Sequence, residues 1–267
     1  MLGANLPIEF SKGEAAPGQH EINLRYSDAL EMADNHVVFK NGVKEIAHLE
    51  GQSATFMAKP FADQPGSSCH IHTSLWSLDG QTPLSPGDAG NGMSGEFRSF
   101  VAGLVNHLAD VTLLGAPNIN SYKRYQPESW APTATVWALD NRTAGLRLVG
   151  TGPGLRIESR IPGADANPYL AFAGVIAAGL AGIEEGLDCG PPYDGNAYAA
   201  GAEGDTALTH VPWNLPDATE AFRNSEVAQK ALGEDVMFHL AHGADEEWRA
   251  FHREVSDWEY RRGYERL

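Results

Sequence analysis

The chain has 267 residues, of which 42% are hydrophobic and 20% are charged, and its formal net charge is −16. This length allows one large domain or two small ones, and the composition is that of an ordinary globular protein. The acidic balance argues against a nucleic-acid-binding or anionic-membrane surface, because either surface needs a basic footprint.

The number of cysteines and the length of the apolar segments indicate whether the protein is disulfide-linked, secreted or membrane-spanning. Cys69 and Cys189 are the only cysteines, so we predict no disulfide framework and favour a reducing cytoplasm. The start, MLGANLPIEF, lacks the basic and long apolar regions of a secretory signal. The most apolar segment, 169–183, is short for a membrane span and carries three glycines. We interpret it as a buried helix whose small residues allow close packing.

Strands and helices both follow from the residue pattern. Alternation of polar and apolar residues predicts strands at 21–26, 69–75 and 156–161. Helical stretches are expected at 27–48, 94–114 and 168–187, with several more from 216 to the end. The fold class is therefore α+β, and hairpin-like strands predict an antiparallel sheet with helices on its outer face.

The predicted strands have unusual polar faces. These faces hold His70, His72 and Ser74 on the second strand and Arg156, Glu158 and Arg160 on the third. A strand face of this kind is either exposed to solvent or the wall of a polar cavity. Taken alone, each strand favours the exposed, structural interpretation. Three such strands in one chain shift the balance toward a cavity that binds metal and phosphate.

Two glutamates near the start are candidate metal ligands. Glu14 and Glu21 flank a segment with proline and glycine, so a turn would bring both carboxylates to one site. Hard cations such as Mg²⁺ take carboxylate oxygens. With His70 and Glu158, the set becomes a mixed carboxylate–imidazole group compatible with Mg²⁺ or Mn²⁺. The alternative for an isolated pair of glutamates is a solvated surface.

Arginines are concentrated in the middle of an otherwise arginine-poor chain. They are Arg124, Arg142, Arg147, Arg156 and Arg160. Fixed guanidinium groups recognise carboxylates and phosphates through paired hydrogen bonds, and phosphoryl transfer needs such donors. For each arginine taken singly, a surface ion pair is the alternative.

Seven motifs resemble the successive signatures of glutamine synthetases, in the family's order and spacing. They are EAAPGQHE (14–21), FMAKP (56–60), HIHTSL (70–75), NSYKR (120–124), NRTAGLR (141–147), RIESR (156–160) and NPYL (167–170). Each motif alone is weak to moderate evidence, but the ordered set is specific and extends over essentially the whole chain. The sequence thus resembles the catalytic, carboxyl-terminal domain of that family.

The resemblance implies a fold and a domain boundary. It implies an α+β catalytic domain over residues 1–267, with a curved antiparallel sheet lining the active site and helices packed outside. The family's amino-terminal β-grasp domain, and a following strand with further metal-binding glutamates, are expected to be missing here. The chain is then a fragment, a mispredicted start or one piece of a longer gene. A homo-oligomeric ring is expected for the complete protein.

The resemblance also implies an activity and a role for each matching residue. ATP would phosphorylate the γ-carboxylate of L-glutamate, and ammonia or an organic amine would then form the amide, with Mg²⁺ or Mn²⁺ as cofactor. Metal binding is implied for Glu14, Glu21, His70 and Glu158. Substrate binding is implied for Gly66, Arg124, Arg160 and Trp130. Nucleotide binding is implied for Glu9, His72, Ser74, Arg142, Arg147 and Arg156. Catalytic roles are implied for Arg142, Glu158 and Arg160.

The sequence departs from the family at the amine site. Ammonia-using members commonly carry a glutamate six residues beyond the arginine of NSYKR, where this chain has Trp130. An indole cannot accept a proton, but it can stack against an alkyl amine or face a cation. Trp130 therefore favours a polyamine or ethanolamine over ammonium. Glu128 is an alternative proton acceptor, and Trp130 packed beside Pro132 is the structural alternative.

Further departures affect the substrate loop and regulation. Pro65 replaces an asparagine that often precedes the glycine of the glutamate-binding loop. Tyr198 lies near the position that some bacterial members adenylylate, but its flanking residues match poorly, so we do not expect that modification. A family member without catalytic activity, retained for assembly or regulation, is the rival interpretation of the whole chain.

Overall fold

The computed structural model describes residues 2–198 and 208–266, and it contains two sheets. The strands β1 (Ile8–Gly13) and β2 (His20–Leu24) form an antiparallel ribbon. The second sheet has four strands in the order β3–β6–β5–β4. Their bounds are Ile71–Thr73 for β3, Trp137–Leu139 for β4, Leu146–Val149 for β5 and Arg156–Ser159 for β6. All three strands expected from the sequence are present, although each is shorter than predicted.

The antiparallel arrangement is confirmed for most of the sheet and wrong for one edge. The strand β6 pairs antiparallel with both β3 and β5, whereas β4 pairs parallel with β5. The strand β4 reads WAL, and all of its residues except Leu139 are buried, so it has no polar–apolar alternation. The pattern that identified the other strands was therefore absent there.

The helices in the first two thirds of the described chain follow the predicted order. They are α1 (Ala29–Leu49), α2 (Gly95–His107), α3 (Thr112–Gly115), α4 (Ile119–Tyr122) and α5 (Pro168–Glu184). The single helix predicted at 94–114 is wrong, because it divides into α2 and α3. A tight turn ends α2, where the N–H of Asp110 donates to the carbonyl of His107 at 3.1 Å.

Four carboxyl-terminal α-helices and two 3₁₀ helices complete the described elements. The carboxyl-terminal ones are α7 (Leu215–Arg223), α8 (Glu226–Leu232), α9 (Glu234–Arg253) and α10 (Asp257–Gly263). Two 3₁₀ helices lie at Leu2–Ala4 and Gly152–Gly154. The several helices predicted after 216 are thus confirmed. Side chains cap most of these starts; for example, Ser256 accepts from Glu259 at the start of α10.

Glycines bring α2 and α5 into close contact, as the small residues of 169–183 predicted. A side chain at Gly182 would collide with the backbone of Ser99 and Gly103, and one at Gly179 would collide with the ring of Phe100. These two helices pack through buried residues that belong to one continuous apolar core with the inner face of the sheet. The core therefore lies on one side of the sheet and leaves its other face for polar residues.

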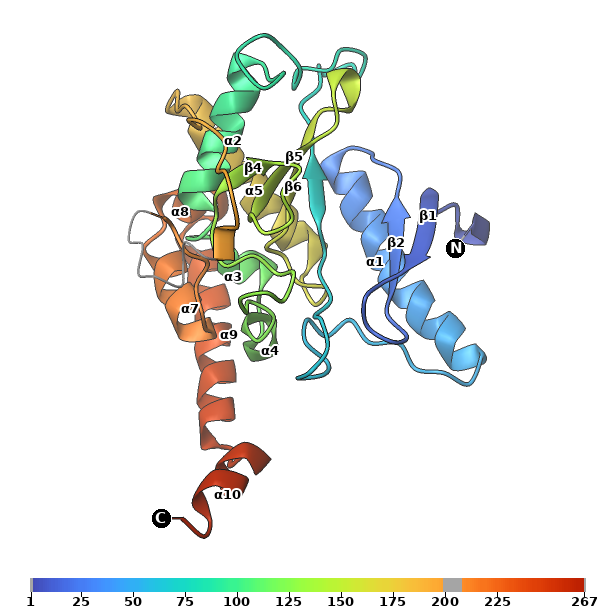
Figure 1. The fold of residues 1–267 in the computed structure, drawn as a ribbon, viewed down its shortest axis with the longest axis vertical. Helices are drawn as coiled ribbons and strands as arrows, with labels where there is room; N and C mark the ends of the chain where they lie inside the picture. The colour runs from blue at the N-terminus through green and yellow to red at the C-terminus, as the bar shows by residue number, and fades with distance from the viewer. Residues whose placement is uncertain (1, 199–207, 267) are drawn as a thin grey trace.

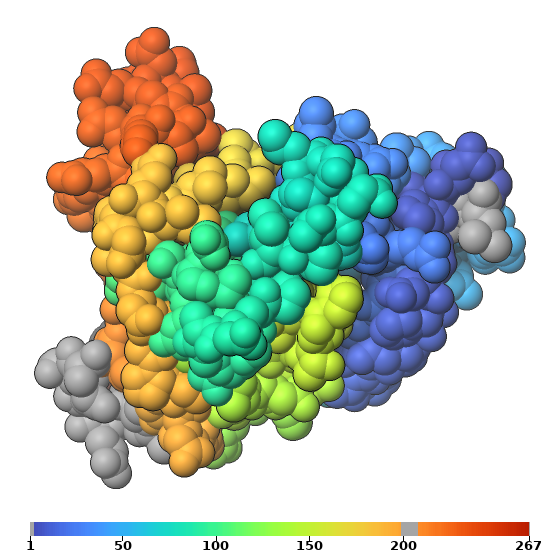
Figure 2. Space-filling model, turned by 90° about the horizontal axis from the view of Figure 1, so that it is seen from above, coloured from blue at the N-terminus to red at the C-terminus, as the bar shows by residue number. Residues whose placement is uncertain are grey.

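The elements are arranged around the four-stranded sheet as Figure 1 shows. The helices α2, α7, α8 and α9 lie on one side and α1 with the β1–β2 ribbon on the other, while α5 lies between them and contacts both α1 and α2. The end of α9 runs away from the body and leads to α10. Seen from above in Figure 2, the amino-terminal part and the carboxyl-terminal helices likewise lie at opposite sides. Within the described residues, no helix has the length and apolar character needed to cross a bilayer.

Candidate active site

A buried glutamate, Glu158, organises the polar face of the sheet. It lies in β6 directly opposite His72 of β3 and Arg147 of β5, and it is only 3% exposed. Its Oε1 lies 3.0 Å from Nδ1 of His70 and accepts a hydrogen bond from Arg160 at 3.1 Å. Its Oε2 accepts from Arg147 at 3.0 Å. The polar faces of β3 and β6 that the sequence predicted therefore meet, and Glu158 and Arg160 are buried there whereas His72 is exposed.

The charges in this cluster favour anions. Burial by itself raises the pKa of Glu158, but the hydrogen bond from His70 and the charge of Arg160 outweigh burial and hold that pKa well below its usual range. Burial lowers the pKa of His70, and it lowers the pKa of His72 to about 4. One ionised carboxylate therefore faces neutral imidazoles and the two guanidinium groups of Arg147 and Arg160. The excess positive charge suits phosphate or carboxylate.

Arg124 and Arg160 form a second layer behind Glu158. They are 2% and 3% exposed, and Nη1 of Arg124 donates to the carbonyl of Arg160 at 3.4 Å. Gly66 lies against this pair, because a side chain there would meet Cγ of Arg124 at 2.6 Å. The structure thus brings together Gly66, Arg124 and Arg160, three of the four residues predicted to bind the substrate.

Trp130, the fourth predicted substrate residue, is attached to the same pair through its backbone. Its carbonyl accepts from Nη2 of Arg160 at 3.1 Å, while 60% of the residue is exposed. Both Trp130 (φ 65°) and Glu128 (φ 61°) have left-handed backbones, which residues with side chains rarely adopt. Hydrogen bonds from Ser129 to the carbonyls of Gln126 (2.6 Å) and Arg124 (3.0 Å) hold this turn. An exposed indole in a strained turn above two arginines fits a ligand contact better than packing beside Pro132.

The predicted nucleotide residues are partly assembled. Nε of Arg156 donates to Nδ1 of His72 at 3.1 Å, and its Nη1 donates to the carbonyl of Gly154 at 3.0 Å. The hydroxyl of Ser74 accepts from Nε1 of Trp76 at 3.0 Å. The first contact places Arg156 beside His72, which lies opposite Glu158 in the sheet, and Ser74 directly follows β3.

Two more predicted nucleotide residues lie at different distances from the cluster. Burial lowers the pKa of Arg160, and the positive charges of Arg147 and then Arg142 lower it further, whereas Glu158 raises it. Arg142 itself lies in the loop that joins β4 to β5, the strand of Arg147. Glu9 instead belongs to the β1–β2 ribbon, where it is exposed. The structure does not bring Glu9 into the arginine cluster.

The two amino-terminal glutamates do converge, but on a lysine. Nζ of Lys12 lies 3.0 Å from Glu14 and 3.2 Å from Glu21. Across residues 2–198 and 208–266, no group of three or more His, Cys, Asp or Glu side chains is arranged to hold a metal ion. The predicted set is therefore two separate pairs, Glu14 with Glu21 and His70 with Glu158. Their donors still fit Mg²⁺, which binds through one or two carboxylates and retains several waters.

Two residues that organise the site were missed by the sequence analysis. The side-chain amide of Gln19 donates to the carbonyl of Gly66 at 3.0 Å and to Oγ of Ser67 at 3.1 Å, so it ties the ribbon to the substrate loop. Asp140 accepts from Nε of Arg147 at 2.8 Å and orients that guanidinium. Gln19 lies inside the EAAPGQHE motif and Asp140 directly precedes NRTAGLR. Their position in or beside a motif was the available signal.

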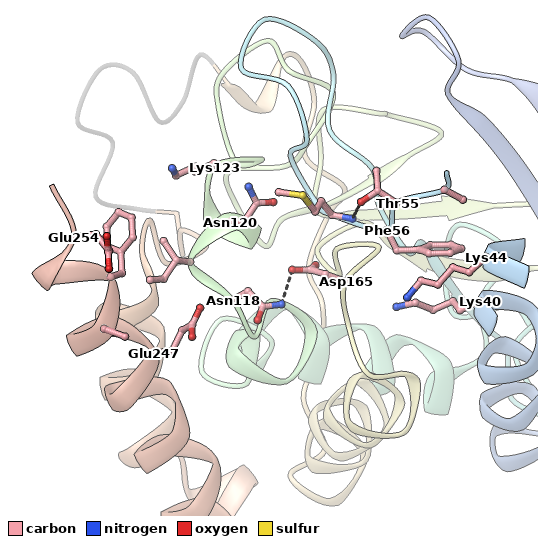
Figure 3. A pocket seen from close by; sticks show the side chains of 15 residues that line it. Lys40, Lys44, Thr55, Phe56, Asn118, Asn120, Lys123, Asp165, Glu247 and Glu254 are labelled. Atoms are coloured by element: carbon pink, nitrogen blue, oxygen red, sulfur yellow. Dashed lines mark hydrogen bonds between the residues drawn. The ribbon is translucent and has the colours of Figure 1, made fainter. Parts of the chain in front are cut away.

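A cavity of about 780 Å³ lies elsewhere, between α1, α4 and the end of α9. Figure 3 shows Lys40 and Lys44 at one end and Glu247 and Glu254 at the other. Both lysines lie over the ring of Phe56, at 5.2 and 5.9 Å from its centre. None of the predicted site residues lines this cavity. Because it carries charges of both signs, it does not select one class of ligand.

Comparisons with known proteins agree with the geometry. The family model described as glutamine synthetase, catalytic domain, matches residues 1–263. A γ-glutamylethanolamide synthetase of Streptomyces coelicolor is 50% identical over 267 residues, which are 100% of this chain and 56% of the relative. A glutamate–isopropylamine ligase of a Pseudomonas species is 40% identical over 98% of this chain and 57% of the relative. The solved structure of a GmaS/ADP complex matches with a TM-score of 0.90 and 35% identity, covering 99% of this chain and 61% of that chain.

The fold is α+β, and its four-stranded sheet carries a cluster of arginines around the buried Glu158. The chain belongs to the glutamine synthetase family and corresponds to its catalytic domain. It spans about 56% of the length of the Streptomyces relative.

Proposed function

We propose that the protein to which this chain belongs is an ATP-dependent ligase that joins the γ-carboxylate of L-glutamate to ammonia or an organic amine. One observation carries the proposal: Arg124 and Arg160 are buried, and their Nε–H groups find no hydrogen-bond partner among the described residues. Buried charged donors without partners suit a carboxylate ligand. Membership of the glutamine synthetase family supports the same activity.

The proposed chemistry has two steps. An oxygen of the glutamate γ-carboxylate attacks the γ-phosphorus of ATP, and ADP leaves with the electrons of the broken P–O bond. The amine nitrogen then attacks the acyl carbon, phosphate leaves, and the nitrogen loses a proton to give the amide. The first step is needed because a carboxylate has no good leaving group, whereas phosphate leaves readily. Positioned arginines favour the first step by balancing negative charge on the transferring phosphoryl group.

In this proposal, separate groups of residues bind glutamate, the amine and ATP. Gly66, Arg124 and Arg160 hold glutamate, with Trp130 at the amine. The ATP phosphates are held by Arg142, Arg147 and Arg156, and the rest of the nucleotide lies near Glu9, His72 and Ser74. Arg142 and Arg160 also stabilise the developing charge. Glu158 keeps the guanidinium groups of Arg147 and Arg160 in place through the hydrogen bonds described above.

We assign Mg²⁺ or Mn²⁺ as the cofactor. Glu14 and Glu21 would hold one ion, and His70 with Glu158 would hold a second. A bound ion would neutralise charge on the phosphates. Because Lys12 bridges Glu14 and Glu21, it would have to release at least one of them for the first ion to bind.

An organic amine is the proposed second substrate. The support is the exposed indole of Trp130 in place of a carboxylate, together with similarity to proteins named for ethanolamine and isopropylamine products. A homo-oligomeric ring is the proposed assembly. The cytoplasm is the proposed location, because the two cysteines are free and the substrates are cytoplasmic metabolites.

A second candidate is a family member without catalytic activity that acts in assembly or regulation. The chain covers little more than half of its relatives, and the two candidate metal pairs do not meet. Buried arginines whose Nε–H groups have no partner among the described residues argue against it, because an inactive protein gains nothing from such costly groups.

An amine panel tests the proposal. The natural protein is supplied with ATP, Mg²⁺ and a fixed concentration of glutamate, and ADP release is followed with ammonium, ethanolamine, isopropylamine or a polyamine. We expect ADP release that requires both glutamate and an amine, with the γ-glutamyl product identified by mass spectrometry. Arg160→Lys keeps the charge but loses the planar fork, so activity should fall at least tenfold. Arg249→Lys, at an exposed pair with Glu246, should behave as wild type. Absence of ADP release with every amine would favour the inactive family member.

A further inference from the structure

The side chain of Gln19 links the β1–β2 ribbon to the Gly66 loop. Its Nε2 donates to the carbonyl of Gly66 at 3.0 Å and to Oγ of Ser67 at 3.1 Å. Among the described residues, these are the only hydrogen bonds between the ribbon, residues 8–24, and any later part of the chain. The ribbon carries one of the proposed metal pairs, and Gly66 belongs to the proposed glutamate site. Gln19 therefore lies between two proposed ligand sites.

A tight turn holds the Gln19 side chain in this orientation. Pro17 and Gly18 occupy its two central positions, and Gly18 has φ 73°. Proline followed by a glycine with positive φ is typical of a type II turn, which the N–H of Gln19 closes by donating to the carbonyl of Ala16 at 3.0 Å. Oε1 of Gln19 accepts from the N–H of Ala16 at 3.2 Å. A rotated amide would set this oxygen against the carbonyl of Gly66, and both are acceptors. The amide orientation is therefore fixed.

The same turn is bonded to the proposed metal pair. The N–H of Glu14 donates to the carbonyl of Gln19 at 2.9 Å. Lys12 lies opposite Glu21 in the ribbon, and its ammonium bridges the carboxylates of Glu14 and Glu21. A divalent ion bound by this pair would replace the ammonium and fix the carboxylates as its ligands. Because Gln19 is bonded to Glu14, an ion there would also restrict the position of Gln19.

The loop that Gln19 reaches is closely packed. The N–H of Ser67 donates to the carbonyl of Ala58 at 2.8 Å. A side chain at Gly66 would collide with the same carbonyl and with Cγ of Arg124. A shift of Gln19 would therefore move Gly66 against Arg124, which is one of the two arginines proposed to hold glutamate.

We propose that Gln19 is a positioning residue that couples the binding of Mg²⁺ or Mn²⁺ at Glu14 and Glu21 to the binding of glutamate at the Gly66 loop. This inference rests on the proposed function, since it takes glutamate and a divalent ion as the ligands. An ion at one end and glutamate at the other would both favour the arrangement in which the two Gln19 bonds are made. Such coupling is reciprocal, so each ligand raises the affinity of the other by the same factor.

Calorimetry of the natural protein measures the coupling without turnover. Glutamate is titrated with and without saturating Mn²⁺, and the ratio of the two dissociation constants is compared among wild type, Gln19→Met and Gln52→Met. We expect Mn²⁺ to tighten glutamate binding about tenfold in wild type and at most about threefold in Gln19→Met, which loses both bonds. Gln52 is exposed just after α1, so Gln52→Met should keep the wild-type ratio. A merely structural role of Gln19 would weaken both affinities and leave the ratio unchanged.

Ser67→Ala provides a second variant with a milder change. It keeps Gln19 and its turn and removes one of the two acceptors, so its ratio should lie between those of wild type and Gln19→Met. A wild-type ratio in Gln19→Met would overturn the proposal. If Gln19→Met does not fold, Ser67→Ala decides by itself, and a wild-type ratio there would overturn the proposal in the same way.

Failure of this inference is distinguishable from failure of the proposed function. A wild type that binds glutamate equally well with and without Mn²⁺ would overturn the coupling alone, and ADP release that requires glutamate would still support the ligase. A wild type that binds no glutamate under either condition would overturn both proposals.

Discussion

In our proposal, the indole side chain of Trp130 determines whether the enzyme uses ammonium or an organic amine. Burial of an amine's methylene groups against the ring is worth roughly 0.8 kcal/mol per CH₂. Any remaining charge on the amine gains about 0.5–1 kcal/mol over the ring face. An ammonium ion has no methylene groups and is strongly hydrated, so it gains little from an indole.

Trp130→Glu should therefore raise the ratio of kcat/KM for ammonium over the organic amine. The backbone at this position already has φ 65°, so both side chains experience the same strain. The ratio reports differential stabilisation of the two transition states and is independent of expression level. Glu128→Gln is the control, because it removes the alternative proton acceptor. If wild type already prefers ammonium and Trp130→Glu leaves the ratio unchanged, the organic-amine proposal is wrong.

We expect Glu158 to contribute both to stability and to ligase activity. Two substitutions at this position distinguish the two contributions. Glu158→Ala should lower the free energy of unfolding by about 3–5 kcal/mol, because it leaves buried guanidinium groups without their counter-charge. It should also abolish ligase activity and weaken Mn²⁺ binding in calorimetry. Glu158→Gln keeps the volume and should lose activity with less loss of stability. Equal Mn²⁺ affinity in wild type and Glu158→Ala would contradict the metal assignment.

The buried side chain of His36 makes the stability of the folded protein depend on pH. Burial, with a smaller effect from the charge of Lys40, lowers the pKa of His36 to about 4, and its Nε2 lies 3.7 Å from Sγ of Cys69. In the unfolded chain the pKa is about 6.5, so the unfolded state binds a proton first as pH falls. Stability from neutral His36 is therefore present above pH 6.5 and is lost as pH falls toward 4.

His36→Gln should remove that loss. Between pH 7 and pH 5, urea unfolding should show wild type losing about 2 kcal/mol more stability than His36→Gln. His20 is exposed, so His20→Gln should retain the wild-type pH dependence. Parallel stability curves for wild type and His36→Gln would show that His36 does not titrate as its burial predicts.

The helix pair α2–α5 is the element whose packing supports the inner face of the sheet. Gly182 in α5 has no room for a methyl group, because a Cβ there would collide with the backbone of Ser99 and Gly103. Gly243 in α9 has no atom within 4 Å of such a Cβ and is exposed. The same substitution should therefore have opposite effects at the two sites.

Gly182→Ala should destabilise the protein by about 1–3 kcal/mol through overpacking. Gly243→Ala should stabilise it by about 0.5–1 kcal/mol, because alanine has the higher helix propensity. Thermal unfolding of the two variants measures both changes. A stable Gly182→Ala variant would mean that α2 and α5 pack less closely than described.

At the scale of the whole molecule, large apolar side chains are exposed at both ends of the chain, including Leu30 and Leu49 on α1 and Val255 and Trp258 near α10. Exposed apolar side chains favour association where they lie together. The chain also covers only 56% of the length of its Streptomyces relative.

We therefore expect the 267-residue chain by itself to form smaller or heterogeneous particles with little ligase activity. Light scattering of the purified chain gives the particle size, and ADP release from the same sample gives the activity. A uniform ring with full turnover would contradict this expectation. It would show that the described elements suffice for both assembly and catalysis.

The sequence by itself determined the α+β class and the order of the helices. Its alternating strands and ordered motifs were sufficient because side-chain period and local spacing are encoded along the chain. Those signals predicted that His70 and His72 share the face of one strand and Glu158 and Arg160 the face of another, and the register of β3 and β6, which pairs His72 with Glu158, agrees.

Only the tertiary structure decided which long-range partners meet. It pairs β4 parallel with β5, ties Gln19 to the Gly66 loop and joins Arg147 to Glu158. None of these contacts has a local signature, because each joins residues through packing and charge balance rather than through periodicity. Local pattern specifies which groups a strand presents, whereas burial and the competition among neighbouring charges determine which of them come into contact.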